Sequence, residues 1–307
     1  MVGPLVVIVG PTAVGKTAVS VGLARVLDGE IVSADSRQVY REMDVGTAKA
    51  TPEQRARVPH HLIDVVSPDE TLGLAQFQRL AYAAIDSILA RERLPLLVGG
   101  SGQYVRAVVE GWRVPEVAPQ ERLRVVLEAL GGDELARWLR LLDPVAAGRI
   151  DRRNRRRVMR ALEVTLVTGR PISAQQGKSP PPYRVLQVGL MLARSLLYER
   201  VDARVDQMME TGLLEETRLL AGRYGWDVPA MSGLGYAQLG AYLRGEMELE
   251  ESVAAIKRET RRFVRHQANW FKGNDPNIHW FDASEQAQAT AAIEQFVRHW
   301  LAGSTSR

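Results

Sequence analysis

Residues 10–17 have the composition and spacing of a phosphate-binding loop. The run reads Gly10, Pro11, Thr12, Ala13, Val14, Gly15, Lys16 and Thr17, which fits the pattern G-x-x-x-x-G-K-[ST]. In such a loop the glycines let backbone amides curl around phosphate oxygens, the lysine neutralises charge, and the hydroxyl of Thr17 is a predicted ligand of Mg²⁺. The pattern alone suits a nucleotide kinase, an ATPase or any enzyme whose leaving group is diphosphate.

Asp35 is the second candidate for chemistry, because it follows a predicted strand at 30–33. Open α/β sheets place catalytic groups at the carboxyl ends of their strands, close to the phosphate loop. A carboxylate there could orient a magnesium-bound water or accept a proton from a nucleophile. The alternative is that Asp35 caps a helix and is purely structural.

Seven arginines lie between Arg149 and Arg160, in a chain whose 40 basic residues include only five lysines. Arginine forms bidentate hydrogen bonds with phosphates, so this density indicates a surface for an RNA backbone. The alternative is a solvated helix face paired with nearby acids such as Asp143 and Asp151.

The elements that must position these residues follow an α/β order. Residues 5–9, 16–27 and 30–33 predict a βαβ unit, and the apolar runs 94–98 and 185–192 predict further strands of a parallel sheet. Helices are expected at 73–92, 120–130, 133–141, 155–167, 195–221, 235–243 and 250–272.

The chain changes character between residues 113 and 182, where arginine-rich helices end in the stiff connector 179–182. We therefore predict an α/β fold in which residues 1–112 and 183–307 form a P-loop NTPase-like parallel sheet flanked by helices. Residues 113–182 are predicted to be an inserted, all-helical module that binds RNA. The polar tail 303–307 is expected to be frayed.

Composition narrows the class of protein. The 307-residue chain has no cysteine, which excludes disulfides and thiolate catalysis. No apolar run approaches the roughly 18 residues of a membrane span, and no secretory signal pattern is visible. We expect a soluble, cytoplasmic monomer. Adjacent histidines at 60 and 61 lack a clear third ligand, so no zinc site is predicted.

Six groups of residues, in order along most of the chain, carry a family resemblance. They are Gly10–Thr17; Asp35-Ser-Arg-Gln-Val-Tyr40 with Gly46-Thr-Ala-Lys49; His60-His61-Leu-Ile-Asp64; Val98-Gly-Gly-Ser-Gly102 with Tyr104; Arg157-Val-Met-Arg-Ala-Leu-Glu-Val164; and Gly235-Tyr236. With these motifs the sequence strongly resembles the tRNA dimethylallyltransferases, also called isopentenyl-tRNA transferases. Together the motifs are far more specific than the phosphate loop.

The resemblance implies that the phosphate loop holds the diphosphate of dimethylallyl diphosphate rather than ATP, with Thr12 as a further contact and Mg²⁺ as cofactor. It also implies that Asp35 is the general base toward the exocyclic amine of adenosine. Ser101 stands at a substrate position that usually holds threonine, and Arg204 is expected to contact the diphosphate. The acceptor implied is adenosine 37 in the anticodon stem-loop of tRNAs that read codons beginning with U.

The resemblance further implies a set of tRNA contacts at two places in the chain. Around the reaction centre they are Asp35, Ser36, Arg37, Gln38 and Ser101. In the insert they are Arg122, Arg156, Arg157, Val158, Met159 and Arg160.

Three departures from the family pattern bear on these contacts. Arg152 and Arg153 stand where the family usually has proline and asparagine. Gln103 replaces a commonly apolar residue, and residues 265–267 vary the basic cluster that usually precedes Trp270.

Three other functions are consistent with parts of the pattern. A small-molecule or nucleotide kinase would use ATP at the same loop and aspartate. An RNA-binding protein without catalysis would leave Asp35 a structural role. A relative that prenylates free adenine nucleotides would not need the large basic insert.

Overall fold

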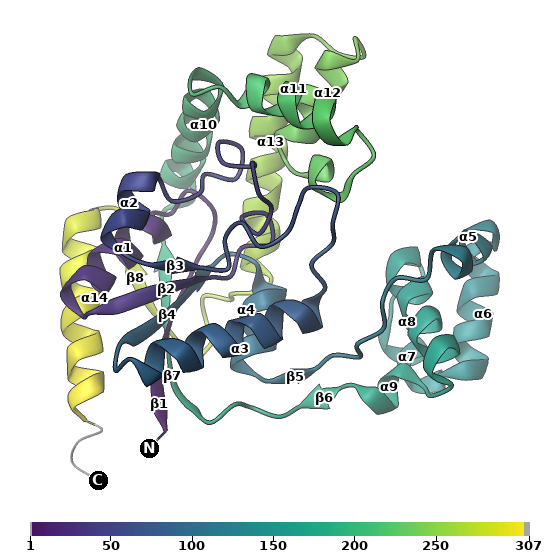
Figure 1. Cartoon of the computed structure of the whole chain (residues 1–307), viewed down its shortest axis with the longest axis horizontal. Helices are drawn as coiled ribbons and strands as arrows, with labels where there is room; N and C mark the ends of the chain where they lie inside the picture. Colours follow the sequence, from purple (N-terminus) through teal and green to yellow (C-terminus); the bar gives the residue numbers. More distant parts are fainter. Residues whose placement is uncertain (1, 304–307) are drawn as a thin grey trace. The chain divides into compact units, whose positions relative to one another are not determined.

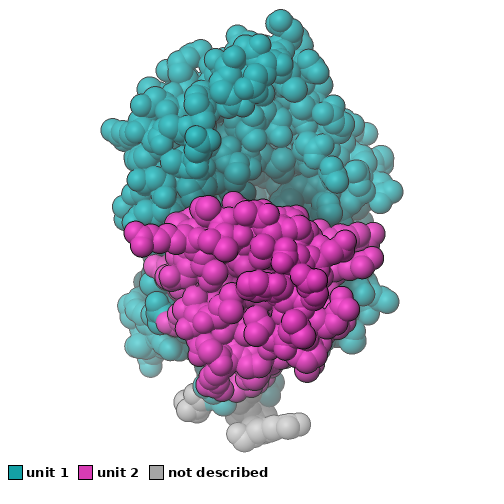
Figure 2. Space-filling view, turned by 90° about the vertical axis from the view of Figure 1, so that its right-hand side faces the viewer, with its two compact units in different colours: residues 1–73, 77–106, 182–307 teal, residues 74–76, 107–181 magenta. Residues whose placement is uncertain are grey.

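The protein is described by a computed structural model that covers residues 2–303. These residues form two compact units, coloured separately in Figure 2. Within the described part, the first unit comprises residues 2–73, 77–106 and 182–303, and the second comprises residues 74–76 and 107–181. The polar tail that was expected to be frayed lies outside the described residues after Gly303.

The first unit is built on a six-stranded sheet in the order β3-β2-β4-β1-β7-β8 (Figure 1). The strands are β1 (Gly3–Val9), β2 (Gly29–Ser33), β3 (His60–His61), β4 (Leu94–Gly99), β7 (Tyr183–Met191) and β8 (Ile278–Asp282). All neighbouring strands pair in parallel. The prediction of an α/β fold with a parallel sheet flanked by helices is confirmed.

The carboxyl ends of β1, β2 and β4 meet at one edge of this sheet. Val9 pairs with Gly99 at the ends of β1 and β4, and Ser33 at the end of β2 also pairs with β4. The end of β4 lies very close to the main chain just after β2: a Cβ at Gly99 would lie 2.1 Å from the carbonyl oxygen of Ala34. The three loops that follow these strands therefore begin side by side.

Helices flank the sheet. They are α1 (Lys16–Val26), α2 (Pro52–Arg57), α3 (Leu74–Ala90), α4 (Gly102–Val109), α10 (Arg194–Glu210), α11 (Leu213–Tyr224), α12 (Tyr236–Leu243), α13 (Leu249–Ala268) and α14 (Gln286–Ala302), with a 3₁₀ helix, η1 (Pro229–Ser232). Val6 and Ile8 of β1 share one buried cluster with residues of α1, α10 and α14. Alternate residues of a strand point to opposite faces, and a Cβ at Gly3 would lie 2.5 Å from Leu89 of α3. Helix α3 therefore covers the other face (Figure 1).

The second unit is helical and has an apolar core of its own. Its helices are α5 (Glu121–Ala129), α6 (Gly132–Leu142), α7 (Pro144–Arg149), α8 (Arg155–Thr168) and α9 (Ile172–Gln175). Leu127, Leu139 and Leu162 are among its fully buried residues. A short ladder of β5 (Trp112–Arg113) with β6 (Gly177–Lys178) joins the two chain segments at its base.

Apart from residues 74–76, the second unit runs from residue 107 to residue 181, whereas the predicted insert runs from 113 to 182. The reason lies in the pairing of its two connecting segments. The backbone N–H of Ser179 donates to the carbonyl oxygen of Gly111 at 2.7 Å. Residues before 113 are therefore already hydrogen-bonded to the segment that leaves this unit.

Two of the predicted helices differ from those in the structure. The helix expected at 195–221 is two helices, α10 and α11, because Gly212 has φ +102°, in the left-handed region that glycine favours. The helix expected at 250–272 ends at Ala268. Strand β8 and helix α14 were not predicted at all.

Within residues 2–303, no helix has the length and apolar character needed to cross a bilayer.

Replacing Gly99 by alanine should lower the free energy of unfolding by about 1–3 kcal/mol, the usual cost of forcing atoms into a packed site. The clash is with main chain, which cannot swing away as a side chain can. Urea denaturation followed by circular dichroism measures the change. Gly222→Ala is the matched control, because Gly222 lies in α11 with nothing within 4 Å of its Cβ position. An unchanged stability of Gly99→Ala would contradict the close approach of β4 to Ala34.

Candidate active site

The phosphate loop connects β1 to α1, as its sequence predicts. Gly10 has φ +149° and Gly15 has φ +102°, values that favour glycine, and a Cβ at Gly10 would lie 2.7 Å from the carbonyl oxygen of Leu190. The Nζ of Lys16 donates to the carbonyl oxygens of Gly10 at 2.9 Å and Pro11 at 2.8 Å. The lysine therefore folds back along the loop, next to the N-terminus of α1, where anions bind.

Lys16, Asp35 and Arg204 come from three distant segments and act on one another electrostatically. Burial lowers the pKa of Lys16 to about 8; the carboxylate of Asp35 opposes this shift and the charge of Arg204 adds to it. Burial likewise lowers the pKa of Arg204, and Asp35 again opposes the shift. The structure thus brings together two cations and one carboxylate.

Helix α10, which carries Arg204, is held against α13 by ion pairs. Lys257 donates to Asp206 at 2.7 Å, and the Nε of Arg261 donates to Asp202 at 2.9 Å. Leu197, Val201 and Val205 are the buried residues of α10. Arg204 therefore lies on a helix that ion pairs and buried apolar residues anchor to the rest of its unit.

Asp35 lies just beyond β2, in a tight turn. Its Oδ1 accepts a hydrogen bond from the backbone N–H of Arg37 at 2.9 Å. No α-helix begins at residues 36–39, which form a turn, so the alternative reading of Asp35 as a helix cap is wrong. The other carboxylate oxygen accepts no hydrogen bond from any residue between 2 and 303, and is therefore available to a ligand.

Ser101 is placed beside this turn. Its Oγ accepts a hydrogen bond from the backbone N–H of Ser36 at 3.0 Å and donates to the Oγ of Ser36 at 3.2 Å. It precedes α4, and its own N–H donates to the carbonyl oxygen of Ala34 at 3.3 Å. Ser36 and Ser101, both predicted to contact tRNA, are thus neighbours of Asp35.

Arg37 and Gln38 make their contacts within the protein. Arg37 donates to the carbonyl oxygen of Pro229 and to Ser232, both at 3.4 Å. The Gln38 amide accepts from the hydroxyl of Ser33 at 3.0 Å and donates to the carbonyl oxygens of residues 47 and 48. These contacts give the two side chains a role in ordering the turn after Asp35.

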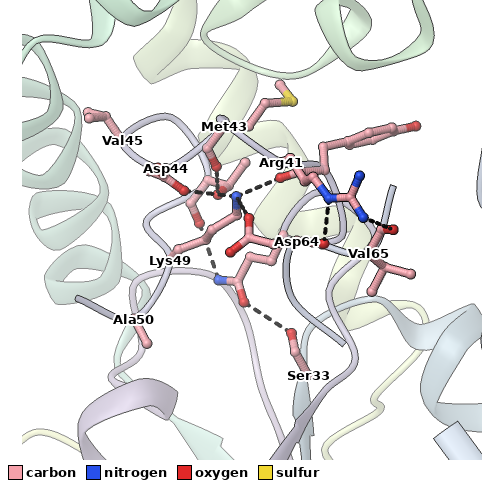
Figure 3. Close-up of polar contacts among 12 residues, drawn as sticks. Ser33, Arg41, Met43, Asp44, Val45, Lys49, Ala50, Asp64 and Val65 are labelled. Carbon is pink, nitrogen blue, oxygen red and sulfur yellow. Dashed lines mark hydrogen bonds and ion pairs between the residues drawn. The ribbon is translucent and has the colours of Figure 1, made fainter. Parts of the chain in front are cut away.

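A buried lysine organises the loop that follows this turn. The side chain of Lys49 is 1% exposed; its Nζ donates to the carbonyl oxygen of Tyr40 at 2.5 Å, to Asp44 at 2.9 Å and to Asp64 at 2.6 Å (Figure 3). Asp64 also accepts from Arg55 at 2.8 Å, and these cations lower its pKa against the opposing effect of burial. The motif residues Lys49 and Asp64 therefore stabilise the fold of the loop that follows Asp35.

Glu216 of α11 holds the same loop from its other side. Its carboxylate accepts hydrogen bonds from the backbone N–H groups of Asp44 and Val45 at 2.8 Å and of Gly46 at 3.0 Å. It also accepts from the hydroxyl of Tyr236 at 2.6 Å. A Cβ at Gly46 would lie 2.5 Å from the ring of Tyr236. The two residues belong to different family motifs, and the ring can pack here only because residue 46 has no side chain. Sequence reasoning did not find Glu216, because no local pattern marks it.

Five arginines of the insert divide into two groups. Arg122, Arg156 and Arg157 are exposed, and their side chains form no hydrogen bond or ion pair with any residue between 2 and 303. Arg160 instead donates to Glu163 at 2.6 Å, as Arg124 does at 2.8 Å. The first group is free to contact an anionic ligand.

Glu163 is an internal counter-ion for the second group. Burial disfavours its charged form, but hydrogen bonds from Arg124, Gln120 and Arg160 outweigh this effect and lower its pKa to about 2. Val158 is 2% exposed in the apolar core, and Met159 is partly buried against the same core. The predicted tRNA contacts of these two residues stay predictions. Arg153 pairs with Asp151, as the alternative of a solvated face predicted, but Asp143 is buried and accepts hydrogen bonds from Ala146 and Ser173 instead.

Thr17 is the residue best suited to a magnesium ion. Its hydroxyl makes no hydrogen bond with the described residues, and it stands in the first turn of α1 after Lys16. Among residues 2–303, no three His, Asp or Glu side chains gather closely enough to hold a metal. The Thr17 hydroxyl is an oxygen ligand of the kind that Mg²⁺ takes, and substrate phosphates and water would have to supply most of the other ligands.

Comparison with known proteins identifies the family. The family model described as IPP transferase matches residues 38–274. The curated tRNA dimethylallyltransferase of Roseiflexus castenholzii is 54% identical over 297 residues, which cover 94% of this chain and 97% of that protein. The chain also resembles the crystal structure of a Bacillus halodurans tRNA isopentenylpyrophosphate transferase, with a TM-score of 0.74, 40% identity and 98% coverage of both chains.

A second solved structure, of a eukaryotic dimethylallyltransferase acting on tRNA, has a TM-score of 0.81 and 27% identity, covering 93% of this chain and 75% of the other. The similarity in sequence and the similarity in fold to these proteins thus both extend over almost the whole length of this chain. The chain belongs to the IPP transferase family.

Proposed function

We propose that this protein transfers a dimethylallyl group from dimethylallyl diphosphate to the N6 amine of adenosine 37 in tRNAs that read codons beginning with U. The observation that carries the proposal is the grouping of Lys16 and Arg204, which suit a diphosphate, with Asp35, which suits a base. The names of the relatives, tRNA dimethylallyltransferase and tRNA isopentenylpyrophosphate transferase, support the same reaction.

The reaction is a direct displacement. The N6 nitrogen of adenosine forms a bond to the allylic carbon, the carbon–oxygen bond to diphosphate breaks, and diphosphate leaves with the electron pair. An aromatic amine is a weak nucleophile because its lone pair is delocalised. Asp35 accepts the amine proton as the new bond forms, which makes the attack easier. No covalent enzyme intermediate is needed.

The leaving diphosphate gains charge as the bond breaks. Lys16, Arg204 and the backbone amides of residues 10–17 stabilise that charge, which is largest in the transition state. Thr17 would hold a Mg²⁺ ion, which would neutralise a further part of the diphosphate charge.

The acceptor must present a base to this buried centre. An adenine in a stacked anticodon loop has to leave its stack before its amine can reach Asp35. Ser36 and Ser101, next to Asp35, are proposed to contact the displaced nucleotide. Arg122, Arg156 and Arg157 are proposed to bind the tRNA backbone, and the enzyme is proposed to act in the cytoplasm as a monomer.

The direct test is transfer of radiolabelled dimethylallyl diphosphate to unmodified tRNA in the presence of Mg²⁺, with ATP hydrolysis measured in parallel. Label in RNA that does not depend on ATP is the expected result. ATP-dependent phosphoryl transfer without labelled RNA would instead indicate a kinase. Transfer to free adenine nucleotides but not to tRNA would indicate the nucleotide-prenylating alternative.

Asp35→Asn should lower kcat by about 10²–10⁴-fold, the usual contribution of a positioned base. Binding of tRNA, measured by filter retention, should persist, because the change removes no positive charge. Asp69→Asn is the control, since Asp69 is an exposed acid of the same unit. Full activity of Asp35→Asn would exclude Asp35 as the base.

Affinity for dimethylallyl diphosphate should fall as pH rises through about 8, because the free enzyme loses the positive charge of Lys16 above its lowered pKa. A single proton linked to binding gives a limiting decrease of about tenfold per pH unit. Titration calorimetry between about pH 7 and pH 9.5 measures the profile. Lys16→Ala should bind more weakly, with a flat profile over this range. A profile that Lys16→Ala leaves unchanged would assign the titration to another group.

The double variant Arg156→Ala/Arg157→Ala should bind tRNA more weakly at low salt and show a smaller salt dependence. Removing one arginine that binds a phosphate should reduce the slope of log affinity against log salt by about 0.7–0.9. The control is Arg258→Ala/Arg262→Ala, which removes the same charge from exposed positions of α13. Equal effects of the two double variants would point to net charge rather than to a specific surface.

A further inference from the structure

The side chain of Gln267, near the end of α13, bridges two loops of the site. Its Oε1 accepts a hydrogen bond from the backbone N–H of Thr12 at 2.8 Å, and its Nε2 donates to the carbonyl oxygen of Gly100 at 3.1 Å. The residue is only 5% exposed. One buried amide therefore connects the phosphate loop to the turn that carries Ser101.

The surroundings leave this amide little freedom. A Cβ at Gly100 would lie 2.3 Å from the Nε2 of Gln267, so the main chain approaches the amide directly. Trp270, just after α13, packs on Gly102, where a Cβ would lie 2.3 Å from the indole. Arg106 of α4 donates to the carbonyl oxygen of Trp270 at 2.8 Å. The end of α13 is thus fixed to both sides of the Ser101 turn.

We propose that Gln267 is a positioning residue that sets the separation between the diphosphate-binding loop and the Ser101 turn; this inference rests on the function proposed above. An amide suits the role because it offers one acceptor and one pair of donors, and here each is used on a different loop. A carboxylate would keep the acceptor toward Thr12, lose the donor toward Gly100, and place negative charge beside a loop that binds diphosphate.

The test compares Gln267→Met and Gln267→Glu with the wild type. Methionine keeps the length of the side chain and loses both hydrogen bonds. It should weaken binding of inorganic pyrophosphate, measured by calorimetry, by about tenfold, and raise KM for dimethylallyl diphosphate while KM for tRNA is unchanged. It should also lower kcat by on the order of 10- to 100-fold, because the reacting groups are misplaced. Glutamate should weaken pyrophosphate binding at least as much, through charge repulsion.

Ser252→Ala is the matched control on the same helix. It removes one hydrogen bond, from the Oγ of Ser252 to the carbonyl oxygen of Gln238 at 3.2 Å, at another buried position of α13. It should lower the melting temperature without changing KM, kcat or pyrophosphate affinity. If Gln267→Met behaves in the same way, Gln267 is only structural and the proposal is overturned.

The pyrophosphate titration separates this inference from the proposed function. If the wild type fails to prenylate tRNA, the proposed function is wrong. Loss of pyrophosphate affinity in Gln267→Met would still show that Gln267 positions the phosphate loop. If the wild type prenylates tRNA and both variants keep its affinity and kinetic constants, only the inference falls. Should the methionine variant not fold, the glutamate variant supports the same comparison, because it keeps one of the two hydrogen bonds.

Discussion

Three strands that run parallel and end at the same level of the sheet impose the geometry of the site. Pairing of Val9 with Gly99, and of Ser33 with β4, brings three loops to one edge. The missing side chain at Gly99 is what allows the main chain of Ala34 to come so close. Because the sheet sets these positions, Asp35 and Ser101 each follow the end of a strand by two residues, and no long loop is needed to place them.

The carboxylate at this edge offsets only part of the buried positive charge before any substrate arrives. Burial penalises Lys16 and Arg204, and Asp35 is the carboxylate that offsets the penalty. Isolated buried charges are expensive, so such a group is stable only as a set. A diphosphate would bring the negative charge that the two cations need, and Asp35 would then be released from its role as their counter-ion. In the proposed reaction, the same carboxylate would act as a counter-ion in the free enzyme and would accept a proton in the complex.

The parts of this arrangement that sequence reasoning found are those with a local signature. The phosphate loop, the first βαβ unit and the position of Asp35 follow from fixed spacing and from apolar runs that are short and continuous. The break at Gly212 was missed because the flanking residues keep a helical pattern. The contacts of Glu216 and Gln267 were missed because their partners are distant in sequence, and no local pattern marks the role of a single glutamate or glutamine on a helix. The structural roles of the family motifs likewise became clear only from the contacts that their residues make in the folded chain.

The bridge from Thr12 to Gln267 spans 255 positions of the chain. Contacts of such separation are slow to form, because a long loop must close before the contact stabilises anything. Chains also fold from the N-terminus as they are synthesised. The phosphate loop is among the first segments made, yet its backbone gains this partner only after α13 has left the ribosome. A nascent chain therefore carries the substrate-binding sequence long before it has the substrate-binding geometry.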